Sequence, residues 1–209
     1  MSARLRTAPT KSALLNLRKQ VRFLVDGHAL LERKRELLTR LVYQHIKEYQ
    51  GKKGTAHAAL RKAYRWLAIA QLRMGDRSIA QATLGATPST SMKVLPRRAL
   101  GVQYPSVEAA VVAPQPVGLL GTDPSFDEAR KSFAEAAVRL AELAAVEMAL
   151  HRLISEQRKA QKRVNALKYN IIPSYRKVIK QIAESLEEEE RGTLFQIKRL
   201  RDASVKKRT

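Results

Sequence analysis

Residues 14–49 read LLNLRKQVRFLVDGHALLERKRELLTRLVYQHIKEY, and this stretch decides the fold. Apolar side chains recur in it at alternating intervals of about three and about four residues, which is the spacing of a helix that packs along a partner helix. The positions on this stripe are Leu14, Leu17, Val21, Leu24, His28, Leu31, Arg35, Leu38, Val42, His45 and Tyr49. The stretch therefore predicts one half of a coiled coil.

The same helical arm extends in both directions. Pro9 and Thr10 suit its start, because proline tolerates the first helical turn and threonine can cap it. Gly51 and Gly54 predict a weakened stretch, since each glycine costs a helix about 1 kcal/mol relative to alanine. After them the stripe resumes in what reads as a shifted frame, which predicts a local unwinding of the supercoil. It then consists of Ala56, Leu60, Ala63, Leu67, Ala70 and Met74.

A second stripe of the same spacing lies near the C-terminus. It consists of Val146, Leu150, Leu153, Gln157, Ala160, Val164, Leu167, Ile171, Ser174, Val178 and Ile182. Pro173 lies inside it and predicts a kink, because the stripe continues beyond the proline. Asp123 or Ser125 is expected to cap the start of this arm.

Two such arms in one chain predict an all-α fold, a long antiparallel two-helix coiled coil with a small irregular insert. If the turn lies between the arms, residues that face each other have numbers that add up to about 200. The predicted parts are an N-terminal arm (1–75), the insert (76–125) and a C-terminal arm (126–209).

The insert is rich in proline, which removes a backbone donor and clashes with the preceding helical turn. A long helix is therefore excluded there by Pro88, Pro96, Pro105, Pro114, Pro116 and Pro124. Its β-branched runs 102–104 and 107–112 predict a short β-hairpin that turns at Pro105 and Ser106. Residues 80–92 are expected to form a loop, and residues 118–122 a turn before the second arm.

Composition excludes several classes of function. The absence of cysteine excludes disulfide scaffolds, cysteine nucleophiles and thiolate metal sites. No apolar run reaches the roughly 18 residues of a membrane span. The four histidines lack metalloprotease spacing, and the glycines lack the pattern of a phosphate-binding loop. We therefore expect no catalytic residue, no cofactor and no metal. His28, Arg35 and His45, which lie on the first stripe, are expected to fix the register of the helices.

Positive charge is the strongest remaining signal, since 40 Lys and Arg residues against 19 Asp and Glu residues give a net charge of +21. Basic residues gather at both ends of the chain, and an antiparallel pair brings those ends to one tip. Such a tip attracts nucleic acid, anionic lipid or an acidic protein cavity, and charge alone leaves these open. The basic tip comprises Arg4, Arg6, Lys11, Lys198, Arg199, Arg201, Lys206, Lys207 and Arg208.

The segment from Arg163 to Pro173 reads RVNALKYNIIP. It is similar to the most recognisable segment of the D subunit of the V/A-type rotary ATPases. The positions that carry the likeness are Arg163, Val164, Asn165, Ala166, Leu167, Tyr169 and Pro173. Residues 9–18 and 27–37 resemble the opening of that family, and residues 187–198 resemble its end.

The resemblance implies a non-catalytic central-stalk subunit, a rotor that transmits torque between a membrane ring and a catalytic hexamer. One end of the shaft would enter a hexamer of alternating catalytic and non-catalytic nucleotide-binding subunits, which makes the basic tip the hexamer-facing end. The other end, together with the F subunit, would sit on a funnel-shaped subunit above the proteolipid ring. The complex would couple ATP synthesis or hydrolysis to proton or sodium transport, with this chain as a peripheral part on the cytoplasmic face of the membrane.

Under this interpretation we expect no nucleic-acid partner and no direct membrane insertion. A basic coiled coil that binds nucleic acid is the alternative, motivated by the net charge of +21. It predicts tight binding to duplex DNA with a steep dependence on salt. An adaptor on a ribosome or membrane surface is a further alternative. An enzyme that acts alone is disfavoured for want of a catalytic constellation.

Overall fold

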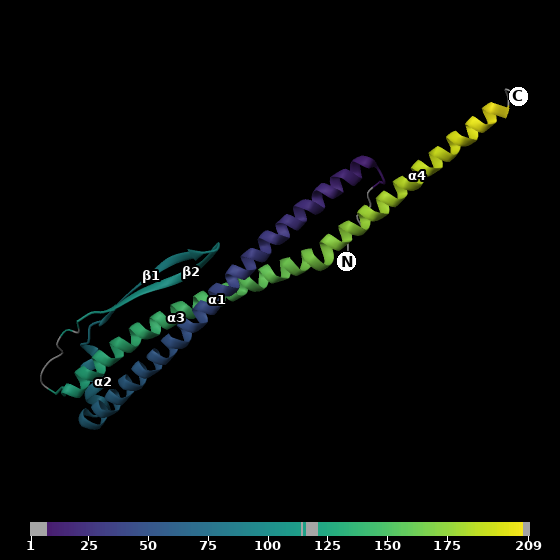
Figure 1. The fold of residues 1–209 in the computed structure, drawn as a ribbon. Coiled ribbons are helices and arrows are strands. Elements are labelled where there is room, and N and C mark those ends of the chain that lie inside the picture. Colours follow the sequence, from purple (N-terminus) through teal and green to yellow (C-terminus); the bar gives the residue numbers. More distant parts are fainter. Residues whose placement is uncertain (1–7, 114, 116–120, 207–209) are drawn as a thin grey trace. The chain divides into compact units, whose positions relative to one another are not determined.

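The computed structural model describes residues 8–113, 115 and 121–206, and the side chains up to residue 201. The elements in chain order are α1 (Lys11–Met74), α2 (Asp76–Leu84), β1 (Thr90–Ala99), β2 (Val102–Val111), α3 (Pro124–Asn165), the π-helix η1 (Ala166–Ile171) and α4 (Ile172–Lys206) (Figure 1). Long helices with one small antiparallel hairpin confirm the predicted fold class. Among the described residues, no helix is both long and apolar enough to cross a membrane.

The chain forms two compact units. Unit 1 comprises Met1–Arg35 with Lys159–Thr209, and unit 2 comprises Glu36–Arg158. In unit 1 the buried apolar side chains come from α1, α3 and α4 and are Leu17, Ala160, Val164, Ile172 and Ile182. In unit 2 the core contains Leu38 and Leu153, which are both completely buried, together with a row of alanines. Each unit therefore has its own apolar seam.

The helix α1 follows the predicted stripe closely. It begins as expected, with the backbone N–H of Ala13 donating to Thr10 Oγ1 at 3.2 Å. Every predicted stripe position from Leu14 to Tyr49 is buried or half-buried. The apolar and polar members of the first stripe thus lie on one face of the helix, as the spacing predicts.

The predicted change of frame after Tyr49 is wrong, whereas the energetic weakening at the two glycines stays a prediction. The helix continues without a break through Gly51 and Gly54. The buried stripe stays in frame, passing through the half-buried Lys52 to the completely buried Ala56, Ala63 and Ala70, which are one heptad apart. A continuous alanine face lets the helices pack closely, and this tertiary packing outweighs the low helix propensity of two glycines.

In unit 2, α1 and α3 pack antiparallel. Three contacts define the register: Lys62 Nζ to Glu135 Oε2 at 3.3 Å, Arg73 to Asp123 Oδ2 at 3.3 Å, and the rings of Tyr64 and Phe133 edge to face at 5.6 Å. In each pair the residue numbers add up to about 200, as the antiparallel arrangement predicts. The contacts confirm the predicted register within this unit.

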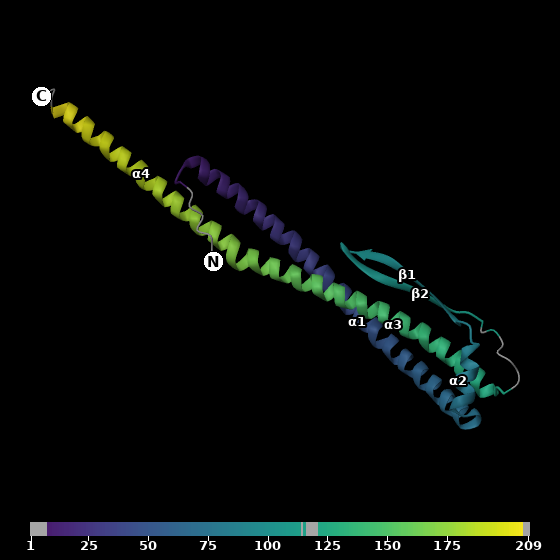
Figure 2. The same ribbon diagram turned by 180° about the vertical axis from the view of Figure 1, so that it is seen from behind.

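The start of α3 is capped as predicted. Asp123 Oδ2 accepts hydrogen bonds from the backbone N–H of Ser125 at 2.9 Å and from the Ser125 hydroxyl. These bonds and the nearby Arg73 guanidinium hold the pKa of the Asp123 carboxyl below its usual range. Pro124 occupies the first helical position, where a missing N–H costs nothing. At the same end of the unit, α2 lies close to the ends of α1 and α3 in both views (Figures 1 and 2).

The insert contains the predicted hairpin, but with different strands. Residues 102–111 form one strand, and its antiparallel partner is 90–99, a segment predicted in part as loop. The turn lies at Leu100 and Gly101, whose φ values of 51° and 80° fit a two-residue hairpin turn of type I′. The predicted turn at Pro105 and Ser106 is wrong, and part of the predicted loop 80–92 is helical in α2. The predicted turn 118–122 lies mostly outside the described residues.

The hairpin rests on the helices of unit 2 through β2. Arg152 of α3 donates to the backbone carbonyl of Gln103 at 2.9 Å, and the ring of Tyr104 lies edge-on to the His45 ring at 5.8 Å. Val102 is buried. A polar cavity of about 260 Å³ remains between the hairpin and the helices, and Glu48 and Glu142 are among the residues that line it. Tyr104 and Ser106 on one face of β2, and Pro105 and Val107 on the other, also line this cavity, so β2 is the strand that lies next to the helices.

Candidate interaction surfaces

The segment that resembles the rotary ATPases contains the one π-helix of the described chain. In η1 the backbone N–H of Ile172 donates to the carbonyl of Leu167, one residue farther back than in an α-helix. Pro173 follows directly and lacks the N–H that an α-helix would direct to the carbonyl of Tyr169. The predicted irregularity at the proline is thus a widened turn that precedes it. Such single π-turns concentrate at functional sites.

Directly after the π-turn the buried stripe lies one residue later than predicted, and it rejoins the predicted positions at Val178 and Ile182. The sequence pattern predicts Ile171 and Ser174 on the stripe, but Ile171 is 38% exposed and Ser174 is exposed. Ile172 is buried instead, at 8% exposed, and Tyr175 is half-buried. A π-turn contains one more residue than the α-helical turn that it replaces, so the residues after it rotate about the helix axis.

The motif residues themselves divide between core and surface. Val164 is buried at the seam of unit 1, and Ala166 and Leu167 are half-buried. Arg163, Asn165, Tyr169 and Pro173 are exposed. Three of the seven motif residues therefore pack the helix pair, and the four exposed ones are available for contacts outside the chain.

A chain of polar side chains connects α1 to this motif within unit 1. Arg35 donates to Gln161 Oε1 at 3.4 Å, and Gln161 Nε2 donates to Asn165 Oδ1 at 2.8 Å. On α1, Glu32 lies 3.9 Å from Arg35 and 3.8 Å from His28 Nδ1. The Arg35–Gln161 contact agrees with the expectation that Arg35 fixes the register, because it joins the two helices. The partner of His28 lies on the same helix, so the expectation for His28 stays a prediction.

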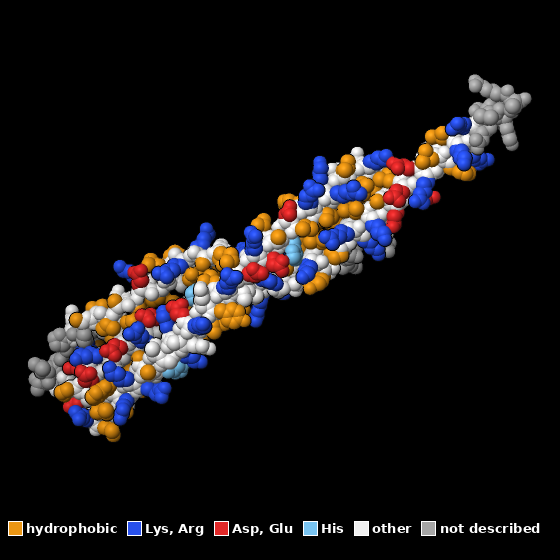
Figure 3. Space-filling model, viewed as in Figure 1, with side chains coloured by type: hydrophobic (Ala, Val, Ile, Leu, Met, Phe, Trp, Pro, Cys, Tyr) orange, Lys and Arg blue, Asp and Glu red, His pale blue; other side chains and the backbone are white. Residues whose placement is uncertain are grey.

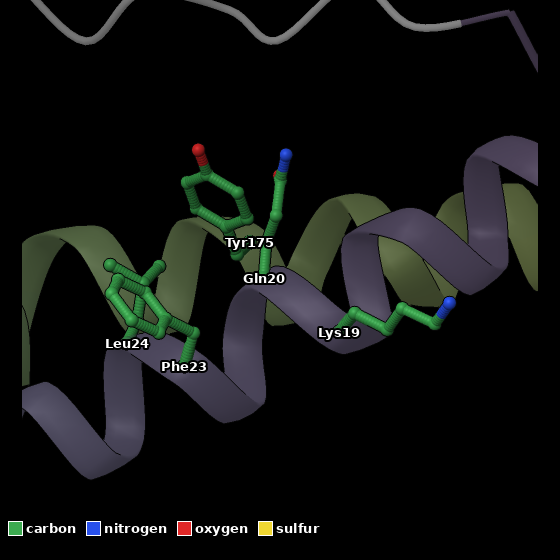
Figure 4. Close-up of a pocket in the computed structure, with 5 residues that line it drawn as sticks. All are labelled: Lys19, Gln20, Phe23, Leu24 and Tyr175. Carbon is green, nitrogen blue, oxygen red and sulfur yellow. The ribbon is translucent and has the colours of Figure 1, made fainter.

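An open hollow of about 340 Å³ lies on unit 1 beside α4. Figure 4 shows Tyr175 of α4 beside Gln20 of α1, with Phe23 and Leu24 close together and Lys19 farther along the helix. Phe23 is exposed. The hollow does not enclose a ligand as small-molecule sites do, so we interpret it as a surface for contact with a larger partner.

Part of the predicted basic tip is described by the structure. Lys11 Nζ forms an ion pair with Glu190 Oε1 at 2.7 Å, which brings the start of α1 to α4. Lys198 and Arg199 are exposed on α4. Arg4, Arg6, Lys207 and Arg208 lie outside the described residues, and Lys206 is described only as the last residue of α4. The clustering of basic residues from the two chain ends at one tip therefore stays a prediction.

The end of α4 carries a second feature, which the sequence analysis missed. Beyond Glu190 the helix exposes four large apolar side chains, each between 60% and 71% exposed: Leu194, Phe195, Ile197 and Leu200. Leu194, Ile197 and Leu200 recur at helical spacing, so the signal for an apolar face was present in the sequence. We call these four residues with Lys198 and Arg199 the α4 end. Basic and apolar side chains occur close together there.

The Lys11–Glu190 ion pair should stabilise the chain only slightly, because both groups are solvent-exposed. The pair lowers the pKa of Glu190 and raises the pKa of Lys11 relative to their usual 4.5 and 10.5. The Glu190 contribution is complete above its unfolded pKa and disappears as pH falls through the lowered folded pKa. The Lys11 contribution is complete below its unfolded pKa and disappears as pH rises through the raised folded pKa.

We therefore expect Glu190→Gln to lower the stability slightly between these limits and to match the unmodified chain in strong acid. Denaturant unfolding at several pH values measures this difference, which about 1 M salt should abolish. Glu189→Gln is the control, since it removes a neighbouring carboxylate that is also exposed. Equal losses of stability in both variants, or a loss that salt leaves unchanged, would contradict the ion pair between Lys11 and Glu190.

Comparison with known proteins gives a consistent result. The model of the ATP synthase D subunit family matches residues 13–202. The chain is 34% identical to the V-type ATP synthase D subunit of Thermotoga neapolitana over 196 residues, which cover 93% of this chain and 97% of that protein. It is 32% identical to the A-type ATP synthase D subunit of Methanosphaera stadtmanae, with 91% of each chain covered. For the protein of the same name from Pyrococcus furiosus the identity is 30%, with 94% of each chain covered.

The matched range includes the first stripe, the hairpin, the π-turn and the α4 end. The helical architecture and the segment 163–173 had already indicated this group of proteins. The chain belongs to the ATP synthase D subunit family and is a component of a rotary ATPase complex.

Proposed function

We propose that this chain is the non-catalytic central shaft of a V/A-type rotary ATPase. It transmits torque between the ion-translocating membrane ring and the catalytic hexamer, and so couples ATP synthesis or hydrolysis to proton or sodium transport. The family and the names of the relatives, V-type and A-type ATP synthase D subunits, support this proposal. Helices packed antiparallel within each unit suit a part that resists twisting.

The proposal includes the partners of the shaft. The α4 end and the basic chain ends face the hexamer of catalytic and non-catalytic nucleotide-binding subunits. The other end sits with the F subunit on the funnel-shaped subunit above the proteolipid ring. The chain is then a peripheral part of the complex on the cytoplasmic face of the membrane. The N-terminal arm (1–75) and the C-terminal arm (126–209) form the shaft, and the insert (76–125) lies at its turn.

The observation that carries the proposal is the composition of the α4 end. A shaft inside a hexamer needs attraction that does not hold it at one angle. Exposed apolar side chains provide contact without directional hydrogen bonds, and the flanking lysine and arginine attract acidic loops at a distance. Leu194, Phe195 and Ile197 have no burial role in their own unit, because each is exposed. A partner surface explains why they are apolar.

The decisive experiment replaces the four apolar residues of the α4 end by serine in the reconstituted complex. Since these side chains are exposed, the thermal midpoint of the isolated chain should stay the same. Rotation under load and coupling of ATP hydrolysis to ion transport should both fall severalfold. A serine variant that rotates with unchanged torque would overturn the proposed role of this end.

The basic chain ends are tested separately by neutralising Arg4, Arg6, Lys206, Lys207 and Arg208 together. The expected result is weaker assembly or lower torque, with the larger effect at low salt. A matched control neutralises five exposed basic residues of the helices, namely Arg40, Lys53, Lys131, Arg139 and Arg158. Unchanged assembly and torque in the first variant would remove the basic tip from the proposal.

A further inference from the structure

Two arginines of α1 lie at a hollow of unit 2 without a partner in the described part of the chain. The hollow has a volume of about 690 Å³. Its lining residues are Arg61, Lys62, Arg65, Trp66 and Ile69. Lys62 pairs with Glu135 of α3 at 3.3 Å. Arg61 and Arg65 are both exposed, and the described residues offer them no ion pair and no hydrogen bond. Their charge is therefore available to a group outside the chain.

The segment of α1 around this hollow is basic throughout. Residues 49–75 contain six Lys and Arg residues and no Asp or Glu. Four of the six have a partner within the chain, and these partners are Glu48, the Tyr49 ring, Glu135 and Asp123. Arg61 and Arg65 are the remaining two. Because this part of α1 supplies no carboxylate of its own, electrostatic complementarity requires an acidic partner.

The two arginines lie on one side of α1. They are four residues apart, which places them about 6 Å apart along the helix axis and about 40° apart around it. Ala63, which is completely buried in the seam, lies about 200° around the axis from each of them. The arginines are therefore on the side of α1 that faces away from the seam. Figure 3 shows basic and hydrophobic side chains together near the end of α1.

The hollow combines this charge with apolar surface. Trp66 and Ile69 are half-buried and line the same hollow as the arginines. Arginine binds a carboxylate through two parallel hydrogen bonds, and an apolar side chain of a partner can pack on the indole beside it. Two carboxylates four residues apart on a partner helix have the spacing of the two arginines. An acidic helix therefore fits the hollow in both charge and spacing.

A nucleic acid and a lipid surface fit the hollow less well. Binding of a single strand needs a continuous basic groove with aromatic faces open for stacking, whereas Trp66 is half-buried and two arginines are available. Binding at a lipid surface needs a helix with a free apolar face. The apolar face of α1 in this segment is the seam itself, where Ala56, Ala63 and Ala70 are completely buried.

We propose that the hollow at Arg61 and Arg65 is a docking site for an acidic helix of another subunit of the complex. Two carboxylates of that helix, one turn apart, bind the two guanidinium groups, and an apolar side chain packs on Trp66. The inference rests on the proposed function, which places other subunits at the end of the shaft opposite the chain ends. The hollow lies near that end, since α1 ends at Met74. The inference adds the chemistry of the contact.

The first test places a photocrosslinking p-benzoylphenylalanine at position 68 in the reconstituted complex. Ala68 is exposed and lies on the same side of α1 as Arg61 and Arg65. Irradiation should join the chain to one other protein subunit, within a peptide that contains at least two carboxylates. The same group at Lys53, which is exposed about four turns earlier, should give several times less of that product.

Other products of this experiment would overturn the proposal. They are products with lipid, with nucleic acid, with a second copy of this chain, or with a peptide that lacks carboxylates. The absence of any product from an assembled complex would overturn it as well.

The second test reverses the charge of the hollow with Arg61→Glu and Arg65→Glu in one chain. Because both side chains are exposed, this variant should unfold at the same denaturant concentration as the unmodified chain. It should bind the crosslinked subunit at least about tenfold more weakly, since attraction becomes repulsion. The matched control combines Lys53→Glu with Arg158→Glu, which makes the same change of charge at two other exposed positions of unit 2 and should bind normally.

An exchange of charges tests the pairing directly. Replacing the two crosslinked carboxylates of the partner by lysine should weaken binding to the unmodified chain and restore binding to the glutamate variant. Failure to restore binding, or normal binding of the glutamate variant to the unmodified partner, overturns this inference alone. Failure of the unmodified chain to enter the complex contradicts the proposed function as well.

Discussion

Replacing Leu38 by alanine should lower the free energy of unfolding by about 2–5 kcal/mol. Leu38 is completely buried in unit 2, so the change removes transfer free energy and leaves a cavity in a seam that consists mostly of alanine. Denaturant unfolding of the complete chain, followed by helical circular dichroism, measures the loss as a lower midpoint with a similar slope.

Leu37→Ala provides the control for this experiment. It makes the same chemical change one residue away, at a position that is 47% exposed. We expect a loss below about 1 kcal/mol, because little of the side chain leaves the core. Similar losses in the two variants would mean that the seam of α1 does not follow the described face.

Replacing Ile172 by alanine should cost about 2–4 kcal/mol, even though the simple heptad pattern leaves this residue off the stripe. Ile172 is buried because η1 contains an additional residue before it. The loss reflects apolar area that returns to water at the seam of unit 1. Denaturant unfolding again provides the measurement.

The matched change is Ile171→Ala, at the position that the unbroken pattern favours. Ile171 is 38% exposed, so its loss should stay below about 1 kcal/mol. If Ile171 proved the costlier position, the helix would be regular through this segment and the π-turn would be absent in solution. The pair therefore tests the backbone conformation directly.

Much of the fold could be predicted because the side chains that bury themselves recur with the period of a helix. Leu17 and Leu38 lie on the predicted stripe and in the observed cores. Thr10 and Asp123 cap the helices that they were expected to cap, since capping depends on a local hydrogen bond. The polar seam residue Arg35 has its partner in Gln161, and the two residue numbers again add up to about 200.

Other features depend on contacts that no local pattern records. The π-turn follows from how the backbone accommodates Pro173 within a packed helix pair, and a frame carried through Ile171 misses it. The strand β1 combines Lys93, Pro96 and Arg97 in no alternating order, and its pairing with β2 defines it as a strand. The shifted frame predicted after Tyr49 was wrong because Ala56 and Ala63 of the predicted second stretch already lie in the first frame, one heptad apart, and both are completely buried.

The candidate interaction surfaces were likewise predicted only in part. Basic residues at the two chain ends were visible in the composition, and the Lys11–Glu190 pair supports bringing α1 and α4 together there. The apolar residues of the α4 end were overlooked because an apolar stripe on a predicted coiled coil is first assigned to the seam. Only the exposure of its side chain distinguishes Leu194 from a core residue.

The π-turn also limits how the gene for this chain can vary. Successive residues of an α-helix are about 100° apart around the helix axis. The loss of a single codon within 166–171 would therefore rotate every later side chain of α4 about that axis by about this angle. Ile182 would leave its packing, and Leu194 and Phe195 would point in a new direction. Insertions or deletions in this short segment are therefore expected to be far more harmful than point substitutions at its exposed positions.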